Sequence, residues 1–484
     1  MSDTTKMSAM DRISKLLDEN SFVEIGAMVT KRNTDYNLKE KSVPEDGVIT
    51  GYGTIGNNLV YVFSQDATAL GGSIGEMHAR KIARLYELAV KVGAPVIGLV
   101  DCAGLRLQEA TDALAGFGDL YLHQTLASGV ILQIKAVFGS CGGGSAILAS
   151  LSDFTLIEKN HGKIFVNSPN ALDGNYTEKC NTASAEFQGA NGMVDYIGED
   201  GEAVLAKIRE LVEILPNNNE DEVFFDECDD DSNRLTPAFF EASEDAKSAL
   251  IDISDNHFFL EIKESYAKDM VTGFIKLNGM TIGAVANRTK IIDENGQMIE
   301  TFDGKLSTQG CEKAIDFIRV CDAYNIPILS LTNVLGFKAS LEEEKTIGRA
   351  AAKLAYLFAN ATVPKINVIV GKAFGSAYIT MNSKHIGADI VFALPQAQIG
   401  MMDANAAVKI IYADEISKSD YSKEFIKEKI EEINQLQGSA EAAAKRGYVD
   451  SIIKPNAARK QLIFAFEMLF TKRESRYSKK HGTV

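Results

Sequence analysis

Short apolar runs alternate with helix-like segments along most of the chain. Residues 95–100, 133–139 and 154–157 are runs dominated by apolar side chains, which are typical of strands buried on both faces of a sheet. The segment at 75–92, just before the first run, instead has the apolar spacing of an amphipathic helix. Strands that alternate with crossover helices predict an α/β fold with a largely parallel sheet.

The same pattern occurs twice. Residues 51–63 and 273–285 each have the pattern of a strand, a turn and a second strand. Both are followed by a helix-like segment, a buried run and a glycine-bearing turn. We interpret this as an internal duplication of an α/β unit. One register aligns Lys81 with Lys313, Pro95 with Pro327, Gly104 with Gly336, Gly139 with Gly371, and Gly143 with Gly375.

The clearest break in composition lies at 216–237, between the two repeats. It contains a run of three asparagines at 217–219 and the acidic run Asp229-Asp230-Asp231. An acidic, turn-forming stretch is typical of a solvated linker. We therefore expect two domains, at 1–225 and 226–484.

Composition narrows the possible functions. The net charge of -16 argues against nucleic-acid binding, which requires clustered cations. The six cysteines are scattered without a Cys-x-x-Cys pair, and the six histidines form no metal-binding motif, so no metal site is expected. The N-terminus lacks an apolar signal region and no apolar run is long enough to span a membrane. A cytoplasmic location is therefore expected.

Two glycine-bearing turns follow buried runs in each half and are the candidate active-site elements. They lie at 101–109 and 139–145, and at 333–337 and 371–378. Glycine allows backbone N–H groups to approach a ligand closely, and the positive end of a following helix attracts an anion. Two such donors aimed at one oxygen form an oxyanion hole. Tight strand-to-helix packing explains a single turn equally well, but four turns at duplicated positions favour a function.

Motifs for other chemistries do not fit the sequence. There is no Gly-x-Ser-x-Gly nucleophile elbow and no Walker motif. The Gly-x-Gly-x-x-Gly match at 51–56 runs into a strand rather than a helix, so dinucleotide binding is not expected. Cys102 and Cys141 lie inside the turns without a partnered histidine and are interpreted as small filler residues.

Cations near the first-half turns are candidates for binding a phosphate-bearing ligand. Arg80 and Lys81 lie on the predicted helix, and Arg106 lies in the turn that follows the first buried run. The alternative is that these cations only lie on a solvent-exposed face of the helix and bind no ligand. This remains the better interpretation of Arg84, on the same predicted helix.

Segments spread over nearly the whole chain carry a family resemblance: 12–24, 46–53, 64–76, 101–109, 127–134, 317–328, 361–365, 372–378 and 383–389. Together they resemble the biotin-dependent carboxyltransferase family. The resemblance is closest to the branch of the propionyl-CoA carboxylase β-subunit and methylmalonyl-CoA carboxyltransferase. The glutaconyl-CoA decarboxylase α-subunit is also similar.

The resemblance implies two tandem crotonase-like domains, each with an oxyanion hole. It also implies an active site where the N-domain of one subunit faces the C-domain of another in a homohexamer, a trimer of dimers. The reaction it implies forms an enolate and a ureido anion, which need backbone dipoles more than side-chain acids. The thioester oxygen is expected at Gly104, Gly143 and Gly144, and the biotin ureido oxygen at Gly336, Gly375, Ser376 and Ala377. The substrate-binding residues are expected to be Gly71, Gly72, Arg80, Lys81, Arg106, Phe337, Lys372 and Ile379.

The chain departs from the family at several of these turns. The family's Asp-Ser-Gly-Gly-Ala-Arg is Asp-Cys-Ala-Gly-Leu-Arg at 101–106, and its Gly-Pro-Cys-Ala-Gly-Gly is Gly-Ser-Cys-Gly-Gly-Gly at 139–144. Its Gly-Gly-Ala is Gly-Ser-Ala at 375–377. These changes keep the backbone donors but alter the pocket walls at Leu105 and Ser376. The acyl group therefore stays open, and Ile379 does not settle it because relatives vary there between an acid and an aliphatic residue.

The resemblance also implies partners. The sequence contains no Ala-Met-Lys-Met attachment motif, so biotin is expected on a separate biotin carboxyl carrier protein. The other partner is a biotin carboxylase, or a membrane decarboxylase subunit to which this chain would bind peripherally. The substrate is a CoA thioester and no metal is expected, because the zinc-binding cysteines of the bacterial acetyl-CoA carboxylase β-subunit are missing.

Three alternatives remain open at this stage. The first is a subunit of a sodium-pumping methylmalonyl-CoA or glutaconyl-CoA decarboxylase, which uses the same site in the opposite direction. The second is a crotonase-type hydratase or isomerase, for which Glu109 is the candidate carboxylate in the first-half turns. The third is an inactive scaffold that keeps the fold.

Overall fold

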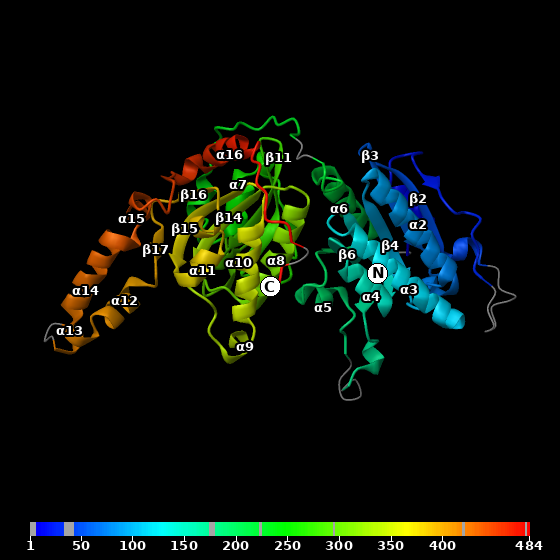
Figure 1. The fold of residues 1–484 in the computed structure, drawn as a ribbon, viewed down its shortest axis with the longest axis horizontal. Helices are drawn as coiled ribbons and strands as arrows, with labels where there is room; N and C mark the ends of the chain where they lie inside the picture. Colours follow the sequence, from blue (N-terminus) through cyan, green and yellow to red (C-terminus); the bar gives the residue numbers. More distant parts are fainter. Residues whose placement is uncertain are drawn as a thin grey trace. The chain divides into compact units, whose positions relative to one another are not determined.

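The chain forms two compact units, Met1–Glu222 and Val223–Val484. The computed structural model describes residues 6–32, 43–173, 180–221, 225–293, 296–418, 422–479 and 482–484. Each unit is a sheet covered by helices (Figure 1), as the alternation of apolar runs and helix-like segments predicts.

The sheet of the first unit has the strand order β1-β2-β3-β4-β5-β6-β8, and β7 pairs with the end of β5. The first three strands are antiparallel neighbours, and the later neighbours run parallel. Every residue of β4 is buried, which explains the apolar run at 96–100. The strands are β1 (Val23–Glu24), β2 (Val48–Ile55), β3 (Asn58–Gln65), β4 (Val96–Cys102), β5 (Gln133–Gly142), β6 (Phe154–Glu158), β7 (Lys163–Phe165) and β8 (Tyr196–Gly198).

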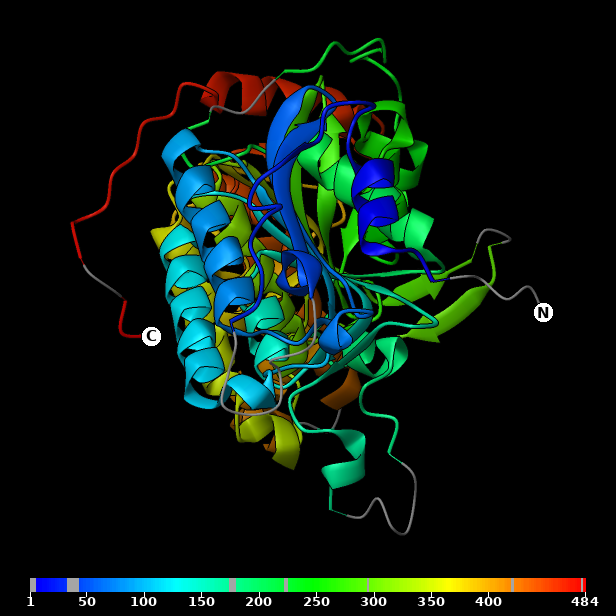
Figure 2. The same ribbon diagram turned by 90° about the vertical axis from the view of Figure 1, so that its right-hand side faces the viewer.

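Helices cover both faces of this sheet. Helices α2 and α3 pack side by side on one face, and α1 lies on the other (Figure 2). The segment predicted as a helix at 75–92 is α2, which ends at Gly93 in the left-handed conformation that commonly ends helices. The helices are α1 (Ala9–Leu16), α2 (Glu76–Val92), α3 (Ala110–Ala127), α4 (Gly144–Ser150), α5 (Ala185–Ala190) and α6 (Gly201–Ile214).

The second unit repeats this strand order as β9-β10-β11-β14-β15-β16-β18, with β17 beside the end of β15. A separate two-stranded ribbon, β12–β13, follows β11. The strands are β9 (Leu260–Ile262), β10 (Met270–Leu277), β11 (Met280–Asn287), β12 (Lys290–Ile292), β13 (Met298–Thr301), β14 (Ile328–Val334), β15 (Lys365–Phe374), β16 (Ile390–Ala393), β17 (Gln398–Gly400) and β18 (Ser451–Ile452).

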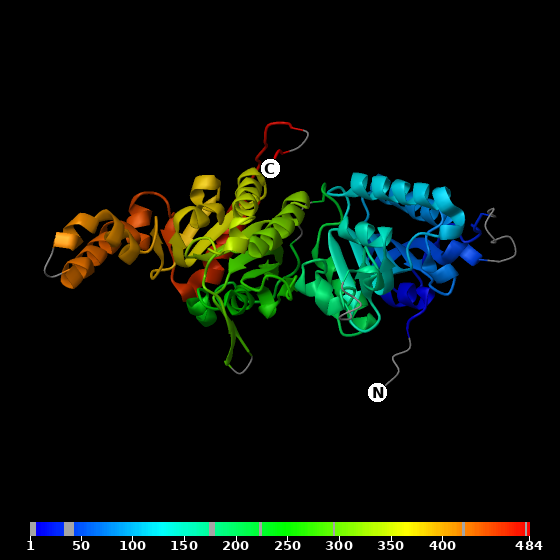
Figure 3. The ribbon, with the colours of Figure 1, turned by 90° about the horizontal axis from the view of Figure 1, so that it is seen from below.

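Helices α8 and α10 pack together on one face of the second sheet, and α7 and α16 lie on the other (Figure 3). Helices α12 to α14 extend away from the sheet (Figures 1 and 3). No helix of the described residues is both long and apolar enough to span a membrane. The helices are α7 (Ala246–Ile253), α8 (Thr308–Ala323), α9 (Leu341–Glu344), α10 (Ile347–Asn360), α11 (Gly375–Thr380), α12 (Ala404–Ile411), α13 (Ala413–Lys418), α14 (Ser422–Ile433), α15 (Ala440–Lys445) and α16 (Ala458–Leu469).

The pairing of the central strands repeats residue by residue. In the first unit Val96 pairs with Gln133 and, after a register shift, Cys102 pairs with Cys141. In the second unit the equivalent pairs are Ile328 with Lys365 and Val334 with Ala373, again separated by a register shift. These pairs keep the register that aligns Pro95 with Pro327, so the structure supports the predicted duplication.

An aspartate caps the hairpin turn in each unit. Asp18 accepts hydrogen bonds from the N–H groups of Gly56 and Asn57, each at 3.2 Å. Asp255 accepts them from Asn278 at 3.0 Å and Gly279 at 2.7 Å. An arginine from a later helix holds each carboxylate: Arg209 at 2.9 Å from Asp18, and Arg459 at 2.6 Å from Asp255.

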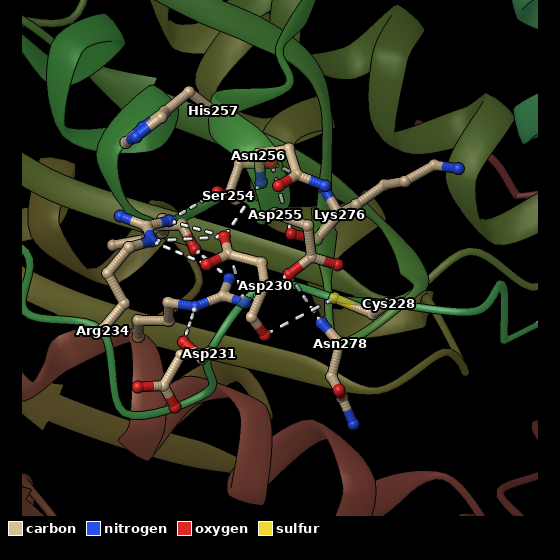
Figure 4. A network of polar contacts seen from close by, with 12 residues as sticks. Cys228, Asp230, Asp231, Arg234, Ser254, Asp255, Asn256, His257, Lys276 and Asn278 are labelled. Atoms are coloured by element: carbon tan, nitrogen blue, oxygen red, sulfur yellow. Dashed lines mark hydrogen bonds and ion pairs between the residues drawn. The ribbon is translucent and has the colours of Figure 1, made fainter.

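The linker predicted at 216–237 contains the division between the two units, but its described residues are tied to the units by hydrogen bonds. Arg234 donates to the Asp230 carboxylate at 2.9 Å and to the carbonyl of Ser254 at 2.9 Å, which packs the acidic run against the second unit (Figure 4). On the other side, the Asn217 carbonyl accepts a hydrogen bond from Leu132 N–H at 3.0 Å. Composition suggested a linker because the neutralising arginines, including Arg459, lie outside the acidic run itself.

Candidate active site

The turns at 101–106 and 143–145 lie together at one edge of the first sheet. Strands β4 and β5 are parallel neighbours, so their carboxyl ends bring the two turns side by side. A Cβ built on Gly104 would lie only 3.1 Å from the carbonyl oxygen of Gly142. The structure therefore brings together Gly104, Gly143 and Gly144, the residues at which the thioester oxygen is expected.

The backbone donors at these turns are not equivalent. The N–H of Gly143 donates to the Phe165 carbonyl at 2.9 Å, and the N–H of Gly104 donates to Cys102 Sγ at 3.2 Å. The N–H groups of Gly144 and Ser145 lie in the first turn of α4, where no preceding helical turn supplies carbonyl partners. Of these two glycines, the geometry therefore favours Gly144 as the residue whose N–H donates to the thioester oxygen. The role of Gly143 is to set the backbone conformation of the turn.

Gly71 and Gly72 support the 101–106 turn from behind. The Gly71 carbonyl accepts a hydrogen bond from Ala103 N–H at 3.0 Å. A Cβ on Gly72 would lie 2.1 Å from the carbonyl oxygen of Asp101, a distance that excludes any larger residue there. Gly72 is buried and Gly71 is exposed, so only Gly71 is open to a ligand within this unit.

Two side chains that sequence reasoning missed hold the turns in place. Asp101 Oδ1 accepts a hydrogen bond from Ser140 N–H at 3.2 Å, and Asn333 Oδ1 accepts one from Lys372 N–H at 2.9 Å. Asp101 is also within 3.1 Å of Arg12, which anchors α1 beneath the turn. Asp101 and Asn333 occupy equivalent positions in the aligned repeats. Comparing the sequences of the two halves could therefore have identified them.

The expectation that Arg106 contacts a ligand phosphate is corrected by its burial. Its guanidinium is fully buried between Asp46 at 2.5 Å and Glu109 at 2.8 Å, and it donates to the Ser73 carbonyl at 2.7 Å. These partners occupy the N–H groups of the Arg106 guanidinium inside the unit. Sequence could not show this because Asp46 is distant along the chain.

Lys81 is likewise held inside the first unit, whereas Arg80 stays exposed. Lys81 Nζ donates to the carbonyls of Glu45 at 3.1 Å and Val48 at 2.5 Å, and burial lowers its pKa. Arg80 pairs with Glu76 at 2.8 Å at the surface. Of the three cations expected to bind substrate in the first unit, only Arg80 is therefore accessible.

The second unit arranges its two turns in the same way. Gly336 follows β14, and Gly375 begins α11 after β15. Ser376 is exposed and Ala377 is buried, and both N–H groups lie in the first turn of α11. A Cβ on Gly336 would meet no atom within 4 Å, so the space beside this turn is open.

The other expected residues of the second unit lie close to these turns. Lys372 is exposed near the end of β15, where it pairs with Gln398 of β17. Phe337 is half-buried and forms a bridge with Leu306. Ile379 is half-buried on α11, one helical turn beyond Ser376. The five positions thus lie in or next to the two turns of the unit: Gly336, Phe337, Lys372, Ser376 and Ile379.

A buried lysine lies beneath α4 of the first unit. Lys135 Nζ donates to the hydroxyl of Tyr86 at 3.0 Å and lies 4.3 Å from the centre of the Phe63 ring. Lys135 and Ser145 both line a cavity of about 20 Å³, room for about one water molecule. Burial lowers the pKa of Lys135 to about 7.

The stability of the protein should therefore depend on pH through Lys135. Its pKa is about 7 in the fold and 10.5 when unperturbed, so between these values the unfolded chain binds more protons and stability rises with pH. Below about pH 7 both states are protonated, so the cost of burying the charged amine is fully present there, and it disappears as the pH rises toward 10.5. We expect Lys135→Met to reduce the rise in the urea midpoint across this range, and the exposed Lys91→Met to leave it unchanged. Equal slopes in wild type and Lys135→Met would contradict the assignment.

No group of three or more metal-ligating side chains forms among the described residues. All six cysteines are free thiols. Cys102, Cys141, Cys311 and Cys321 are buried, and burial raises the pKa of both Cys102 and Cys141. The side chains at the turns thus offer neither a metal site nor an activated thiolate, and backbone dipoles are the main chemical resource of the site.

Comparisons with known proteins agree over the full length of the chain. The carboxyl transferase domain model matches residues 2–484. The chain is 36% identical to methylmalonyl-CoA decarboxylase subunit alpha of Propionigenium modestum, over 99% of this chain and 93% of that one. It is 38% identical to the propionyl-CoA carboxylase carboxyltransferase subunit of Haloferax mediterranei, over 100% of this chain and 94% of the relative.

The fold agrees with a solved structure as well. Transcarboxylase 12S, a hexamer with methylmalonyl-CoA and methylmalonic acid bound, superposes with a TM-score of 0.93 at 34% identity, covering 99% of this chain and 92% of that one. The similarity confirms the predicted α/β fold of two tandem crotonase-like domains.

Proposed function

Because this chain belongs to the carboxyl transferase family and is an acyl-CoA carboxyltransferase, we propose that it moves CO2 between carboxybiotin and a short-chain acyl-CoA, with propionyl-CoA and methylmalonyl-CoA as the pair. One observation carries the choice of acyl group. Two relatives that match nearly the whole chain are named for methylmalonyl-CoA and propionyl-CoA, which are the carboxylated and uncarboxylated forms of one acyl group.

The first unit supports the acyl-CoA side of this proposal. When CO2 leaves methylmalonyl-CoA, or a proton leaves propionyl-CoA, negative charge develops on the thioester oxygen. The N–H of Gly144, at the positive end of α4, would donate to that oxygen, with the 103–106 turn beside it. Donors fixed in advance at such a place are worth about 3 kcal/mol each in comparable sites. Arg80 is the accessible cation left for the CoA phosphates.

The second unit supports the biotin side. A Cβ on Gly336 would meet no atom within 4 Å, and this space would take the flat, neutral urea ring. The N–H groups of Ser376 and Ala377 at the start of α11 would donate to its oxygen. In the carboxylation direction, carboxybiotin would release CO2 and leave a ureido anion. The ureido nitrogen would take the α-proton of propionyl-CoA, and the enolate so formed would then attack the CO2. Ile379 and Phe337, both half-buried, would contact the ring.

The hydratase or isomerase alternative is disfavoured by the position of Glu109. Its Oε1 pairs with Arg106 at 2.8 Å, and its Oε2 accepts the Glu76 N–H at 2.6 Å. The side chain is also buried. A carboxylate fixed by two donors inside the fold is not available as a general base. The scaffold alternative is disfavoured because each unit keeps backbone N–H groups in the first turn of the helix at its site, α4 or α11.

The decarboxylase direction is a second candidate function. It is favoured by the 36% identity to the methylmalonyl-CoA decarboxylase subunit, and it would use the same two sites in reverse. We propose a homo-oligomer, with the hexamer of transcarboxylase 12S as its pattern. The proposed partners are a biotin carboxyl carrier protein and either a biotin carboxylase or a membrane decarboxylase subunit.

Carboxyl transfer to free biotin tests the proposal. The purified protein should convert methylmalonyl-CoA to propionyl-CoA in the presence of biotin, and it should do so faster than it converts malonyl-CoA or glutaconyl-CoA. Hydration of crotonyl-CoA is the control reaction. Faster transfer from malonyl-CoA or glutaconyl-CoA would reassign the acyl group, and crotonyl-CoA hydration without transfer would overturn the carboxyl-transfer function.

A further inference from the structure

One sulfur atom connects the two turns of the first unit. The Cys102 thiol is fully buried at the end of β4. It accepts hydrogen bonds from the Gly104 N–H at 3.2 Å and from the Ser145 hydroxyl at 3.2 Å. Its S–H faces the Gly104 carbonyl at 3.6 Å. Burial raises the pKa of this thiol, so it stays protonated and keeps its S–H donor at neutral pH.

The strand ladder alone does not fix the distance between these turns. The regular pairing of β4 with β5 ends at Val100 and Val137, and the register shifts before Cys102 pairs with Cys141. Beyond this pair, one strand continues into the 103–106 turn and the other into α4. The contact between Cys102 and Ser145 therefore lies at the point where backbone pairing stops and the candidate donors begin.

The second unit lacks this connection. The residues equivalent to Cys102 and Ser145 in the aligned repeats are Val334 and Ala377, and both are buried. Neither side chain can form a hydrogen bond, so the second unit has no side-chain hydrogen bond between these two positions. The polar connection is thus particular to the unit proposed to bind the acyl-CoA.

We propose that Cys102 and Ser145 act together as positioning residues for carboxyl transfer, holding the N-terminal turn of α4 at the distance from the 103–106 turn that the thioester oxygen requires. This inference rests on the proposed function. Neither side chain contacts the reacting atoms in the proposal. They set the direction of the Gly144 N–H, and small displacements of such groups have large effects on rate.

Single and double substitutions test the positioning role. We expect Cys102→Ala and Ser145→Ala each to lower kcat for transfer from methylmalonyl-CoA to biotin by about 10- to 100-fold, with little change in KM. The double variant should be no slower than the slower single one, because both changes break one interaction. Cys102→Ser keeps a donor and an acceptor and should recover most of the lost rate.

Cys141→Ala is the matched control. It removes an equally buried thiol from the facing residue of β5 without removing any of the hydrogen bonds described above. Its kcat should stay close to that of the wild type. A loss of kcat in Cys102→Ala no greater than in Cys141→Ala, or losses that multiply in the double variant, would overturn the proposal.

Hydrogen exchange separates this proposal from the proposed function. The backbone amides of 143–149 should exchange faster in Cys102→Ala and Ser145→Ala than in wild type or Cys141→Ala, whether or not the wild type transfers CO2. Faster exchange with an inactive wild type would reject the proposed function only. Unchanged exchange with an active wild type would reject the positioning role.

Discussion

Gly143→Ala should abolish most carboxyl transfer while leaving the fold intact. Gly143 has φ +58° and ψ −124°, a combination that a residue with a Cβ adopts only under strain of roughly 1–3 kcal/mol. A Cβ at this position would meet no atom within 4 Å, so the added methyl group itself fits. The strain acts on the backbone, and relieving it would rotate the peptide that carries the Gly144 N–H.

The expected loss in kcat is about 100-fold or more, the size found when an oxyanion donor is removed. Steady-state transfer from methylmalonyl-CoA to biotin measures it. Gly118→Ala is the control, because Gly118 lies within α3, where a Cβ would also meet no atom within 4 Å. Alanine is the better helix former there by about 1 kcal/mol, so this variant should be active and at least as stable. Normal activity in Gly143→Ala would show that Gly144 is not a donor in the reaction.

The sequence predicted the central elements well because their signals are local. The buried runs at 95–100 and 133–139 correspond to β4 and β5, and the periodic segment at 75–92 corresponds to α2. The aligned register of the repeats also placed Gly104 and Gly143 at neighbouring strand ends. Each of these inferences needed only spacing along the chain and the rule that parallel strands share an edge.

The parts that sequence could not predict depend on contacts between distant residues. Arg106 and Lys81 had the charge expected of phosphate-binding residues, but Asp46 and the Val48 carbonyl occupy their donors. Cys102 is interpreted from the sequence as filler because no histidine partners it, and only the fold shows the hydrogen bond that it accepts from Ser145 in the next turn. The residue type determines which hydrogen bonds and ion pairs a side chain can form. The fold determines which partners lie close enough to form them.

Arg106→Met should destabilise the first unit strongly. The guanidinium lies fully buried between Asp46 and Glu109, and methionine would fill its volume without its charge. Both carboxylates would then lie uncompensated in the interior, a change that typically costs roughly 3–5 kcal/mol. Unfolding in urea, followed by a probe in the first unit, measures the loss. Arg84→Met is the control, because the Arg84–Glu87 pair lies at the surface and such pairs contribute about 1 kcal/mol or less.

The pH dependence of this loss identifies its cause. Burial already raises the pKa of Asp46 in the presence of Arg106, and removing the arginine raises it further. Above the ordinary pKa of an aspartate the folded variant therefore binds more protons than the unfolded chain, so its stability falls as pH rises and recovers as pH falls. The difference from wild type should therefore shrink as the pH is lowered from neutral toward the ordinary pKa of an aspartate. A difference that stays constant over this range would mean that lost packing, rather than two unpaired carboxylates, destabilises the variant, and Arg106 would then act chiefly by filling space beneath the acyl-CoA turn.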